Sequence, residues 1–317
     1  MKINSLLFIS LFTFFLSCKK ETFYTSWIEH DVPTDLTLNA VHLSDDSTVH
    51  IVGGNVWNDD IYLKSTDAGA TWVLDSLNGK EIYDMQFNPN NNGFAVAWGG
   101  DFYSKESPAD NWSYHNLGFP SETFRGVSFW EKENGIIITG AAYQNGKIIQ
   151  VNESFEATLV DSFEQELSAV FHSEKEIIHI VGYGIVLRSN DGGNTWEKKD
   201  IFGDFFRAIH FPSSNVGYAV GQSGSIIKTI DAGKHWKFIR NGDAISTSNK
   251  SFRSVFFIDE EHGYVVGHDG LFWRTKNGGA NWETMPDLPE VDLHDIFIRD
   301  RKGFIVGKKG KIFSFQL

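Results

Sequence analysis

The sequence predicts an all-β protein, a seven-bladed β-propeller with four-stranded blades. A unit of roughly forty residues recurs seven times along the 317-residue chain. Each unit contains four short segments typical of antiparallel strands, separated by turns, and each places a Trp or Phe at the same point near its end. Such a repeat indicates units that cannot bury their apolar faces alone and therefore pack against their neighbours.

One unit shows how the elements follow one another. In the fifth repeat, turns rich in Pro, Gly, Asn and Ser separate the apolar segments. Four short antiparallel strands in a unit of this length are typical of a propeller blade. The strands of this repeat are expected at residues 207–211, 217–221, 225–229 and 235–239.

The two ends of the chain are out of phase with the repeat. Trp27 starts a fourth strand with no unit before it, whereas the last unit, residues 294–317, ends after its third strand. We therefore expect the N-terminal strand, residues 25–30, to complete the last blade and to remove a free sheet edge. The aromatic position is filled by Trp27, Trp72, Trp112, Phe155, Trp196, Trp236 and Trp282.

An Asp-Gly turn precedes the aromatic residue in four clear copies, one of which has Asn in place of Asp. Asp tolerates turn geometry and binds nearby backbone amides, while Gly supplies a positive φ. The Trp then buries a large ring against the blade. Because a catalytic set would not be spread over separated blades, we interpret these boxes as structural. Their main residues are Asp67 with Trp72, Asp191 with Trp196, Asp231 with Trp236, and Asn277 with Trp282.

The N-terminus has the features of an export signal. Residues 1–17 combine a short basic start with an apolar run too short to span a membrane. They precede Cys18, the only cysteine, in a segment that resembles the lipobox of bacterial lipoproteins. This resemblance implies an acylated Cys18 and a tether over residues 18–24, ahead of a propeller over residues 25–317. Ordinary cleavage nearby, which would leave a free thiol, is the alternative. The expected location is the cell envelope, with the outer membrane favoured.

Charge and composition exclude several classes of function. The net charge of −13 argues against non-specific binding to nucleic acid, which requires a basic surface. The histidines show no ligand spacing typical of a metal site, and no phosphate-binding loop is present. The sequence therefore predicts no metal, no cofactor and a monomeric protein.

The boxes resemble the bacterial neuraminidase, or Asp-box, repeat. The fuller unit, Gly-Tyr-x-Val-Gly, a hairpin, Ile-x-Lys/Arg-Thr/Ser, the box and Trp, resembles the photosystem II assembly and stability factor family over residues 23–317. The resemblance implies a non-enzymatic seven-bladed scaffold that holds partner proteins during assembly. It is specific for the fold and weak for function, because propellers carry unrelated activities.

The same family implies a cluster of arginines at the mouth of the central channel. The matching residues here are Arg125, Arg207 and Arg253, each at the start of an expected innermost strand, and His294 occupies the equivalent position in the last unit. The other three units place Asn39, Tyr83 and Ser168 there.

These arginines have two interpretations, which the sequence leaves open. The planar guanidinium suits carboxylate or phosphate, so they could bind an anionic partner such as an acidic peptide or a C-terminal carboxylate. Alternatively each pairs with an internal acid, for example Asp84 or Asp295, and ties the blades together. Long connections on the same side favour a binding face. They lie at residues 53–60 with Trp57, 140–146 with Tyr143, and 241–251, beside a hairpin with Trp98.

The sequence thus predicts an exported, lipid-anchored scaffold that binds a partner protein or an anionic ligand at its channel face. The predicted site consists of Arg125, Arg207, Arg253, His294 and Trp57. The alternative is a carbohydrate-active enzyme or glycan-binding protein, similar to sialidases or to Asp-box xyloglucanases. A glycosidase would need two carboxylates flanking a sugar cleft. The acids expected in channel-side hairpins are Asp59, Asp60, Asp101 and Asp269.

Overall fold

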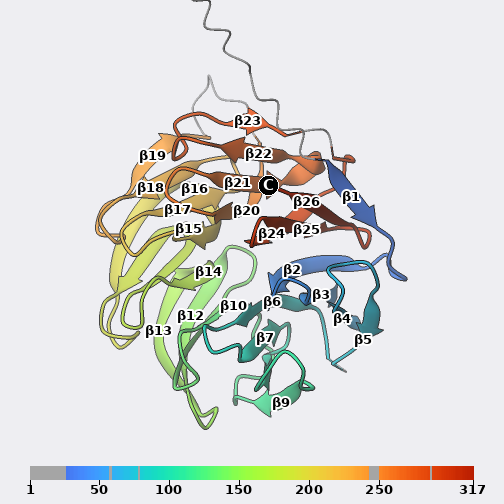
Figure 1. Ribbon diagram of the computed structural model, residues 1–317. Coiled ribbons are helices and arrows are strands. Elements are labelled where there is room, and N and C mark those ends of the chain that lie inside the picture. The colour runs from blue at the N-terminus through green and yellow to red at the C-terminus, as the bar shows by residue number, and fades with distance from the viewer. Residues whose placement is uncertain (1–25, 57–58, 78, 243–249, 286–287) are drawn as a thin grey trace, which may run out of the picture.

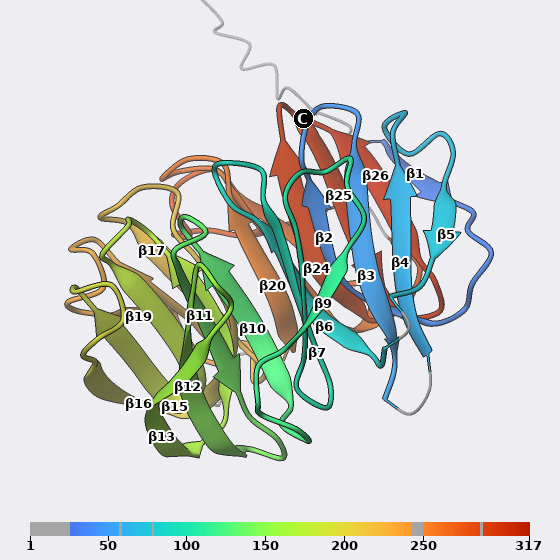
Figure 2. The same cartoon turned by 90° about the horizontal axis from the view of Figure 1, so that it is seen from below.

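The computed structural model describes residues 26–56, 59–77, 79–242, 250–285 and 288–317. Within these ranges it has 26 β-strands and one short 3₁₀ turn, arranged around a central axis (Figures 1 and 2). The predicted all-β class is confirmed. Residues 1–17, the tether, Cys18 and Trp57 lie outside the described residues. In the part of the chain that is described, no helix is long and apolar enough to cross a membrane.

Five sheets have four strands each. In four of these sheets the strands follow one another in chain order from the axis outward, and in the fifth the outermost strand is β1. The first two sheets comprise β2 (Thr37–Leu43), β3 (Val49–Asn55), β4 (Asp59–Ser65) and β5 (Val73–Asp75), then β6 (Ile82–Phe87), β7 (Gly93–Ala97), β8 (Asp101–Lys105) and β9 (Ser113–Asn116). The third comprises β10 (Phe124–Phe129), β11 (Asn134–Thr139), β12 (Gln144–Asn152) and β13 (Ala157–Gln165).

The other two four-stranded sheets hold the C-terminal part of the chain. One comprises β20 (Phe252–Phe257), β21 (Gly263–Gly267), β22 (Phe272–Thr275) and β23 (Glu283–Thr284), with the 3₁₀ turn η1 (His268–Gly270) between β21 and β22. The last comprises β24 (Leu293–Arg299), β25 (Lys302–Gly307), β26 (Ile312–Gln316) and β1 (Trp27–His30).

A sixth sheet has six strands and joins two repeats. It comprises β14 (Leu167–His172), β15 (Ile178–Ser189), β16 (Glu197–His210), β17 (Gly217–Gly221), β18 (Ile226–Thr229) and β19 (Lys237–Arg240). Counting each hydrogen-bonded sheet as one blade, the propeller has six blades, and the prediction of seven is wrong.

The reason lies in the connection between the fourth and fifth repeats. The first part of β16 pairs with β15, and its second part, from Phe206 onward, pairs with β17. Gly203, with a φ of 107°, bends the chain between the two parts without ending the strand. The sheet consequently presents two segments to the axis, β14 and the second part of β16.

The N-terminal strand closes the ring as expected. Strand β1 pairs antiparallel with β26, from Trp27 opposite Phe315 to His30 opposite Ile312. The indole of Trp27 packs edge-on against Phe313 with 5.5 Å between ring centroids, and His30 Nε2 lies 2.8 Å from Ser314 Oγ. The last sheet therefore combines the first and last strands of the chain, which lie side by side in Figure 1.

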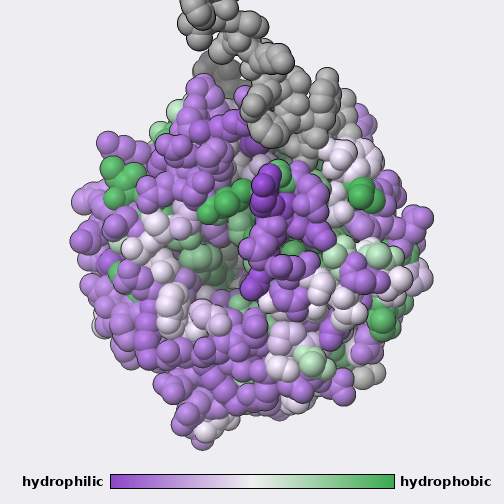
Figure 3. All heavy atoms as spheres, in the orientation of Figure 1, coloured by the Kyte–Doolittle hydropathy of each residue, from purple (hydrophilic) through white to green (hydrophobic). Residues whose placement is uncertain are grey.

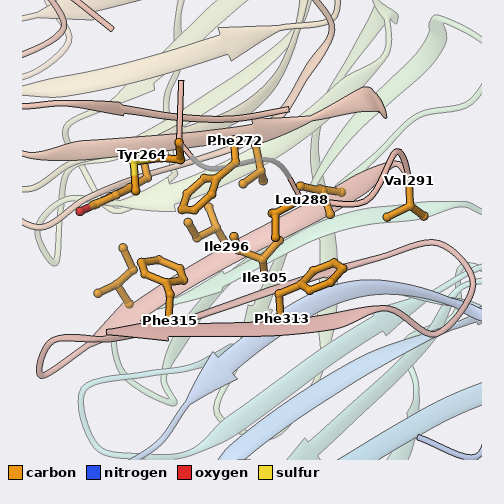
Figure 4. Close-up of a cluster of buried hydrophobic side chains, with 12 residues drawn as sticks. Tyr264, Phe272, Leu288, Val291, Ile296, Ile305, Phe313 and Phe315 are labelled. Carbon is orange, nitrogen blue, oxygen red and sulfur yellow. The ribbon is translucent and has the colours of Figure 1, made fainter. Parts of the chain in front are cut away.

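The hydrophobic core lies mainly between neighbouring sheets. In the cluster of Figure 4, Tyr264 and Phe272 of one sheet meet Ile305, Phe313 and Phe315 of the next. The Phe272 and Phe315 rings are 5.2 Å apart. Burying each such side chain contributes roughly 1.5–3 kcal/mol, so these contacts hold the sheets around the channel as a rigid frame.

The box turns use their polar side chains locally. Asp191 accepts hydrogen bonds from the backbone nitrogen of Thr195 at 2.9 Å and from its hydroxyl at 2.5 Å. Gly193 has a φ of 91° and donates to Ser189 Oγ at 2.9 Å. The equivalent side chains of three other boxes also accept from the backbone four residues on, namely Asp67, Asp231 and Asn277.

Candidate functional site

The innermost strands enclose a cavity of about 470 Å³ on the axis of the ring. All seven residues of the predicted first-strand position line it, because each stands at or near the start of an inner segment. They are Asn39, Tyr83, Arg125, Ser168, Arg207, Arg253 and His294. We call these seven residues the channel mouth. The structure thus brings together every described residue of the predicted site.

Arg125 is the arginine of the mouth that forms an ion pair. Its Nε lies 3.2 Å from Oε1 of the buried Glu166 and donates to the Gly140 carbonyl at 2.9 Å. Its guanidinium also lies 4.6 Å from the ring centroid of Tyr83. The other carboxylate oxygen of Glu166 accepts from the backbone nitrogen of Tyr143 at 2.7 Å. Glu166 therefore fixes both the arginine and the neighbouring loop.

Arg207 is held by neutral groups. Its guanidinium stacks on Phe205, 3.7 Å from the ring centroid, and one terminal nitrogen donates to Gln222 Oε1 at 2.5 Å. Its buried Nε has no partner among the described residues. Burial and the nearby Arg253 lower the pKa of Arg207 to about 10, which leaves the side chain charged at neutral pH.

Arg253 and His294 complete the charged part of the mouth. Arg253 Nε donates to His268 Nε2 at 2.9 Å, and burial lowers its pKa. His294 Nδ1 lies 3.2 Å from Asn39 Oδ1, while its buried Nε2 has no described partner. Burial lowers the pKa of His294 to about 4, so this ring is neutral at physiological pH.

Asp84 and Asp295 bind backbone and hydroxyl groups of adjacent strands instead of the arginines. Asp84 accepts from the nitrogen of Val127 at 2.9 Å, and Asp295 accepts from the nitrogen of Val41 at 2.9 Å and from Ser254 Oγ at 2.7 Å. Burial raises the pKa of Asp84 to about 6 and that of Asp295 to about 7. The acids named in the pairing hypothesis thus connect neighbouring inner strands, and within the described ranges only Arg125 of the three arginines has an acidic partner within 4 Å.

Several residues of the site were missed by sequence reasoning. Glu166, Gln222 and His268 each contact one arginine of the mouth. Gln222 and His268 both directly follow a Gly-Tyr-x-Val-Gly segment, 15 residues after the arginine that each contacts, and this shared position is a signal that the sequence carries. Glu166 is separated from its arginine by some forty residues, a distance that only the folded ring removes. For Glu166 the signal is an acid directly before the strand that begins at Leu167.

The predicted loop aromatics have different outcomes. Trp57 lies outside the described residues, as do residues 243–249 of the expected long connection. Tyr143 is half exposed and packs against Tyr183 and Phe205, with ring centroids 5.3 and 5.4 Å away. Because Phe205 also carries the Arg207 guanidinium, Tyr143 adjoins the mouth. Trp98 instead contacts Lys80.

The acids considered for a glycosidase do not line the channel cavity. Asp59, Asp60, Asp101 and Asp269 are absent from its wall, and Asp60 accepts from Ser76 Oγ and the Leu77 nitrogen. Across the residues that the structure describes, no group of three His, Cys, Asp or Glu side chains is placed to hold a metal ion.

Comparison with known proteins points to assembly factors. A family model described as photosynthesis system II assembly factor YCF48 matches residues 202–292. The photosystem II assembly lipoprotein Ycf48 of Picosynechococcus is 24% identical over 183 residues, which are 52% of this chain and 52% of that protein. The chloroplastic photosystem II stability/assembly factor HCF136 of Guillardia theta is 25% identical over 151 residues, 42% of this chain and 37% of that protein. The chain spans about half or less of the curated relatives that it matches. These findings support a propeller similar to photosystem II assembly factors.

Solved structures confirm the propeller fold. YCF48 from Cyanidioschyzon merolae superimposes with a TM-score of 0.69 at 15% identity, over 92% of this chain and 98% of that one. A structure of YCF48 bound to D1 peptide superimposes with a TM-score of 0.70 at 17% identity, over 93% of this chain and 95% of that one. A virginiamycin B lyase from Staphylococcus aureus superimposes with a TM-score of 0.76 at 12% identity, over 92% of this chain and 99% of that one. Since an enzyme shares the fold as closely as an assembly factor, the fold alone does not decide the function.

Proposed function

We propose that this protein is a non-enzymatic scaffold that holds an anionic segment of a partner protein at its channel mouth. Arg125, Arg207 and Arg253 bind the anionic groups, and His294 contributes a neutral ring. The observation that carries the proposal is that three arginines line one cavity while, among the described residues, only Arg125 is paired with an acid. A protein of net charge −13 that gathers cationic side chains in this way has a local field suited to anions.

The relatives support the same class of function. They are named as assembly factors, and one solved neighbour is bound to a peptide. A rigid propeller with a preformed mouth suits this role, because binding then requires little rearrangement of the scaffold. For this chain the partner is defined only by chemistry, as a protein segment with carboxylates or another anionic group.

Anchoring by lipid is the second part of the proposal. The lipobox-like segment before Cys18 supports acylation of that cysteine, and one relative is named a lipoprotein. Several acyl chains on one cysteine would hold the propeller stably at a membrane of the cell envelope. The outer membrane stays a prediction from the sequence.

Capture from an envelope extract of the native host tests the binding role. The bait is the chain without residues 1–18, compared with the variant Arg125→Ala/Arg207→Ala/Arg253→Ala. A matched control, Lys132→Ala/Lys175→Ala/Lys198→Ala, removes the same charge from ion pairs outside the mouth. We expect a protein that the parent and the lysine variant retain and the arginine variant loses. Equal capture by all three baits would refute the arginine site.

A further inference from the structure

Below the arginines, the cavity has small side chains in its wall, and we call this part of the cavity the chamber. The residues that follow the mouth positions along the inner strands include Ala40, Ala169, Ala208 and Ser254, which all line the cavity. Ala169 and Ala208 are partly exposed to it. The two larger residues at this level are Asp84 and Asp295, whose carboxylates bind neighbouring strands as described above. The small residues therefore leave room directly behind the guanidinium groups.

The far end of the chamber has an aromatic wall. Five rings from separate inner segments follow one another around the axis, each in contact with the next. Their centroids are 5.3 Å apart for Phe171 and His210, 4.5 Å for His210 and Phe256, 5.2 Å for Phe256 and Phe297, and 4.3 Å for Phe297 and His42. All five line the same cavity as the arginines.

The two histidines of this wall are neutral. Burial lowers the pKa of His42 to about 3 and that of His210 to about 4. At physiological pH the wall is therefore an uncharged aromatic surface, in contrast to the cationic mouth. A second cavity, of about 370 Å³, shares His42, Phe171 and Phe297 with the chamber and continues beyond the aromatic wall. The space-filling view shows the molecule hollowed near the centre of one face (Figure 3).

The separation of mouth and wall sets the size of a ligand. The wall residues lie three positions after the mouth residues along each strand, which corresponds to roughly 10 Å. A cavity of about 470 Å³ falls in the range that holds small organic ligands. Such sites combine apolar walls with a few polar groups that fix orientation. Here the arginines lie at the mouth and the aromatic rings at the far end, while Asp84 and Asp295 between them accept hydrogen bonds from neighbouring strands.

We propose that the channel binds an amphipathic anion, with its anionic group at Arg207 and Arg253 and its apolar, preferably flat body in the chamber against Phe171, Phe256 and Phe297. The inference rests on the proposed anion-binding mouth and adds the apolar half of the ligand. A free arylalkyl acid and an aromatic side chain next to an acidic residue of a partner protein share this chemistry.

Calorimetric titration with small probes tests the chamber. The probes are 4-phenylbutyrate, the neutral 4-phenylbutyramide, and butyrate, which lacks the ring. We expect 4-phenylbutyrate to bind at least tenfold more tightly than either of the others. Binding of butyrate and 4-phenylbutyrate with equal affinity would overturn the proposal, because the ring would then gain nothing from the chamber.

Two variants separate the chamber from the mouth. The double variant Ala169→Leu/Ala208→Leu fills the chamber. It should weaken the binding of 4-phenylbutyrate tenfold or more and leave the affinity for butyrate unchanged. Phe256→Leu keeps the wall apolar but removes one ring, and a loss of roughly threefold is expected. Melting curves first establish that both variants fold. Undiminished binding of 4-phenylbutyrate by the folded chamber-filling variant would contradict the proposal.

Peptide probes distinguish the two sources of ligand. A capped hexapeptide with adjacent Phe and Glu is compared with one in which Ala replaces the Phe. Tighter binding of the Phe peptide assigns the chamber to a partner's side chain, whereas binding of 4-phenylbutyrate alone assigns it to a free acid. If the parent captures a partner through its arginines but discriminates neither probe pair, the chamber proposal fails and the proposed scaffold function stands.

Discussion

The box turns and the channel mouth lie at opposite ends of the strands, and both repeat charged residues from unit to unit. In the boxes each aspartate accepts hydrogen bonds within its own turn, as Asp67 does from Thr71 and Asp191 does from Thr195. At the mouth, Arg207 and Arg253 have no acidic partner within 4 Å among the described residues, although both are largely enclosed. Repetition of charged residues alone therefore does not distinguish the two regions. The informative difference is whether the fold itself satisfies the charge.

Opening the ring should have the largest effect, because it weakens the frame of both regions. Deleting residues 19–30 removes β1 and exposes β26, with a loss of about 4 kcal/mol or more in the free energy of unfolding. Urea denaturation measures it. A control that deletes only residues 19–25 isolates the strand, and equal stability of the two truncated proteins would refute closure by β1.

The substitution Glu166→Gln leaves all three arginines of the mouth without an acidic partner among the described residues. The substitution removes the negative partner of Arg125 and should lower the free energy of unfolding by about 2 kcal/mol, discounted from a fully buried pair because Arg125 is partly exposed. It should also strengthen the binding of the captured partner, since the mouth gains one net positive charge. Weaker binding in the folded variant would show that the position of Tyr143 matters more than charge.

The two regions should respond to pH with opposite signs. Hydrogen bonds from Thr71 lower the pKa of Asp67 to about 2, so its contribution to stability is lost as the pH falls from about 4. Burial raises the pKa of Asp295 to about 7, so its folded form prefers a proton and its contribution falls as the pH rises from about 4 to about 7. Buried histidines such as His42 and His210 act in the same direction as Asp67. Stability falls with falling pH below about 6.5, because the buried rings must then take up a charge.

Difference measurements isolate the aspartates from the histidines. The stability of Asp295→Asn relative to the parent should rise by about 1–2 kcal/mol between pH 4 and pH 7, whereas that of Asp67→Asn should fall on going from pH 2 to pH 4. Urea denaturation at each pH gives both differences. The same sign for the two variants would contradict the assigned environments.

A single box should have the smallest effect. Asp191→Ala removes two hydrogen bonds to Thr195 and should cost about 1 kcal/mol of unfolding free energy, with no change in partner binding. Thermal or urea denaturation measures the stability, and the capture assay measures the binding. Loss of capture by the folded variant would assign the boxes a role in recognition.

The sequence predicted the repeat, the strands, the closing strand and the residues of the mouth, because these follow from local periodicity. The number of sheets did not follow, since Gly203 looks like a turn residue and instead bends one continuous strand. The partners of the arginines did not follow either. Glu166 reaches Arg125 from the neighbouring sheet, and Gln222 reaches Arg207 from the hairpin that follows β17 in the same sheet. The chamber depends on small residues whose common level appears only when the inner strands are aligned.

One capture experiment compares the two regions directly. Three immobilised proteins are used: the parent, the Arg125→Ala/Arg207→Ala/Arg253→Ala variant, and a box variant with Asp67→Asn, Asp191→Asn and Asp231→Asn. All three are first shown to fold. The account predicts that the parent and the box variant retain the same partner and that the arginine variant does not. Retention by the arginine variant, or loss by the box variant, would contradict the claim that the unsatisfied charge at the mouth is the binding site.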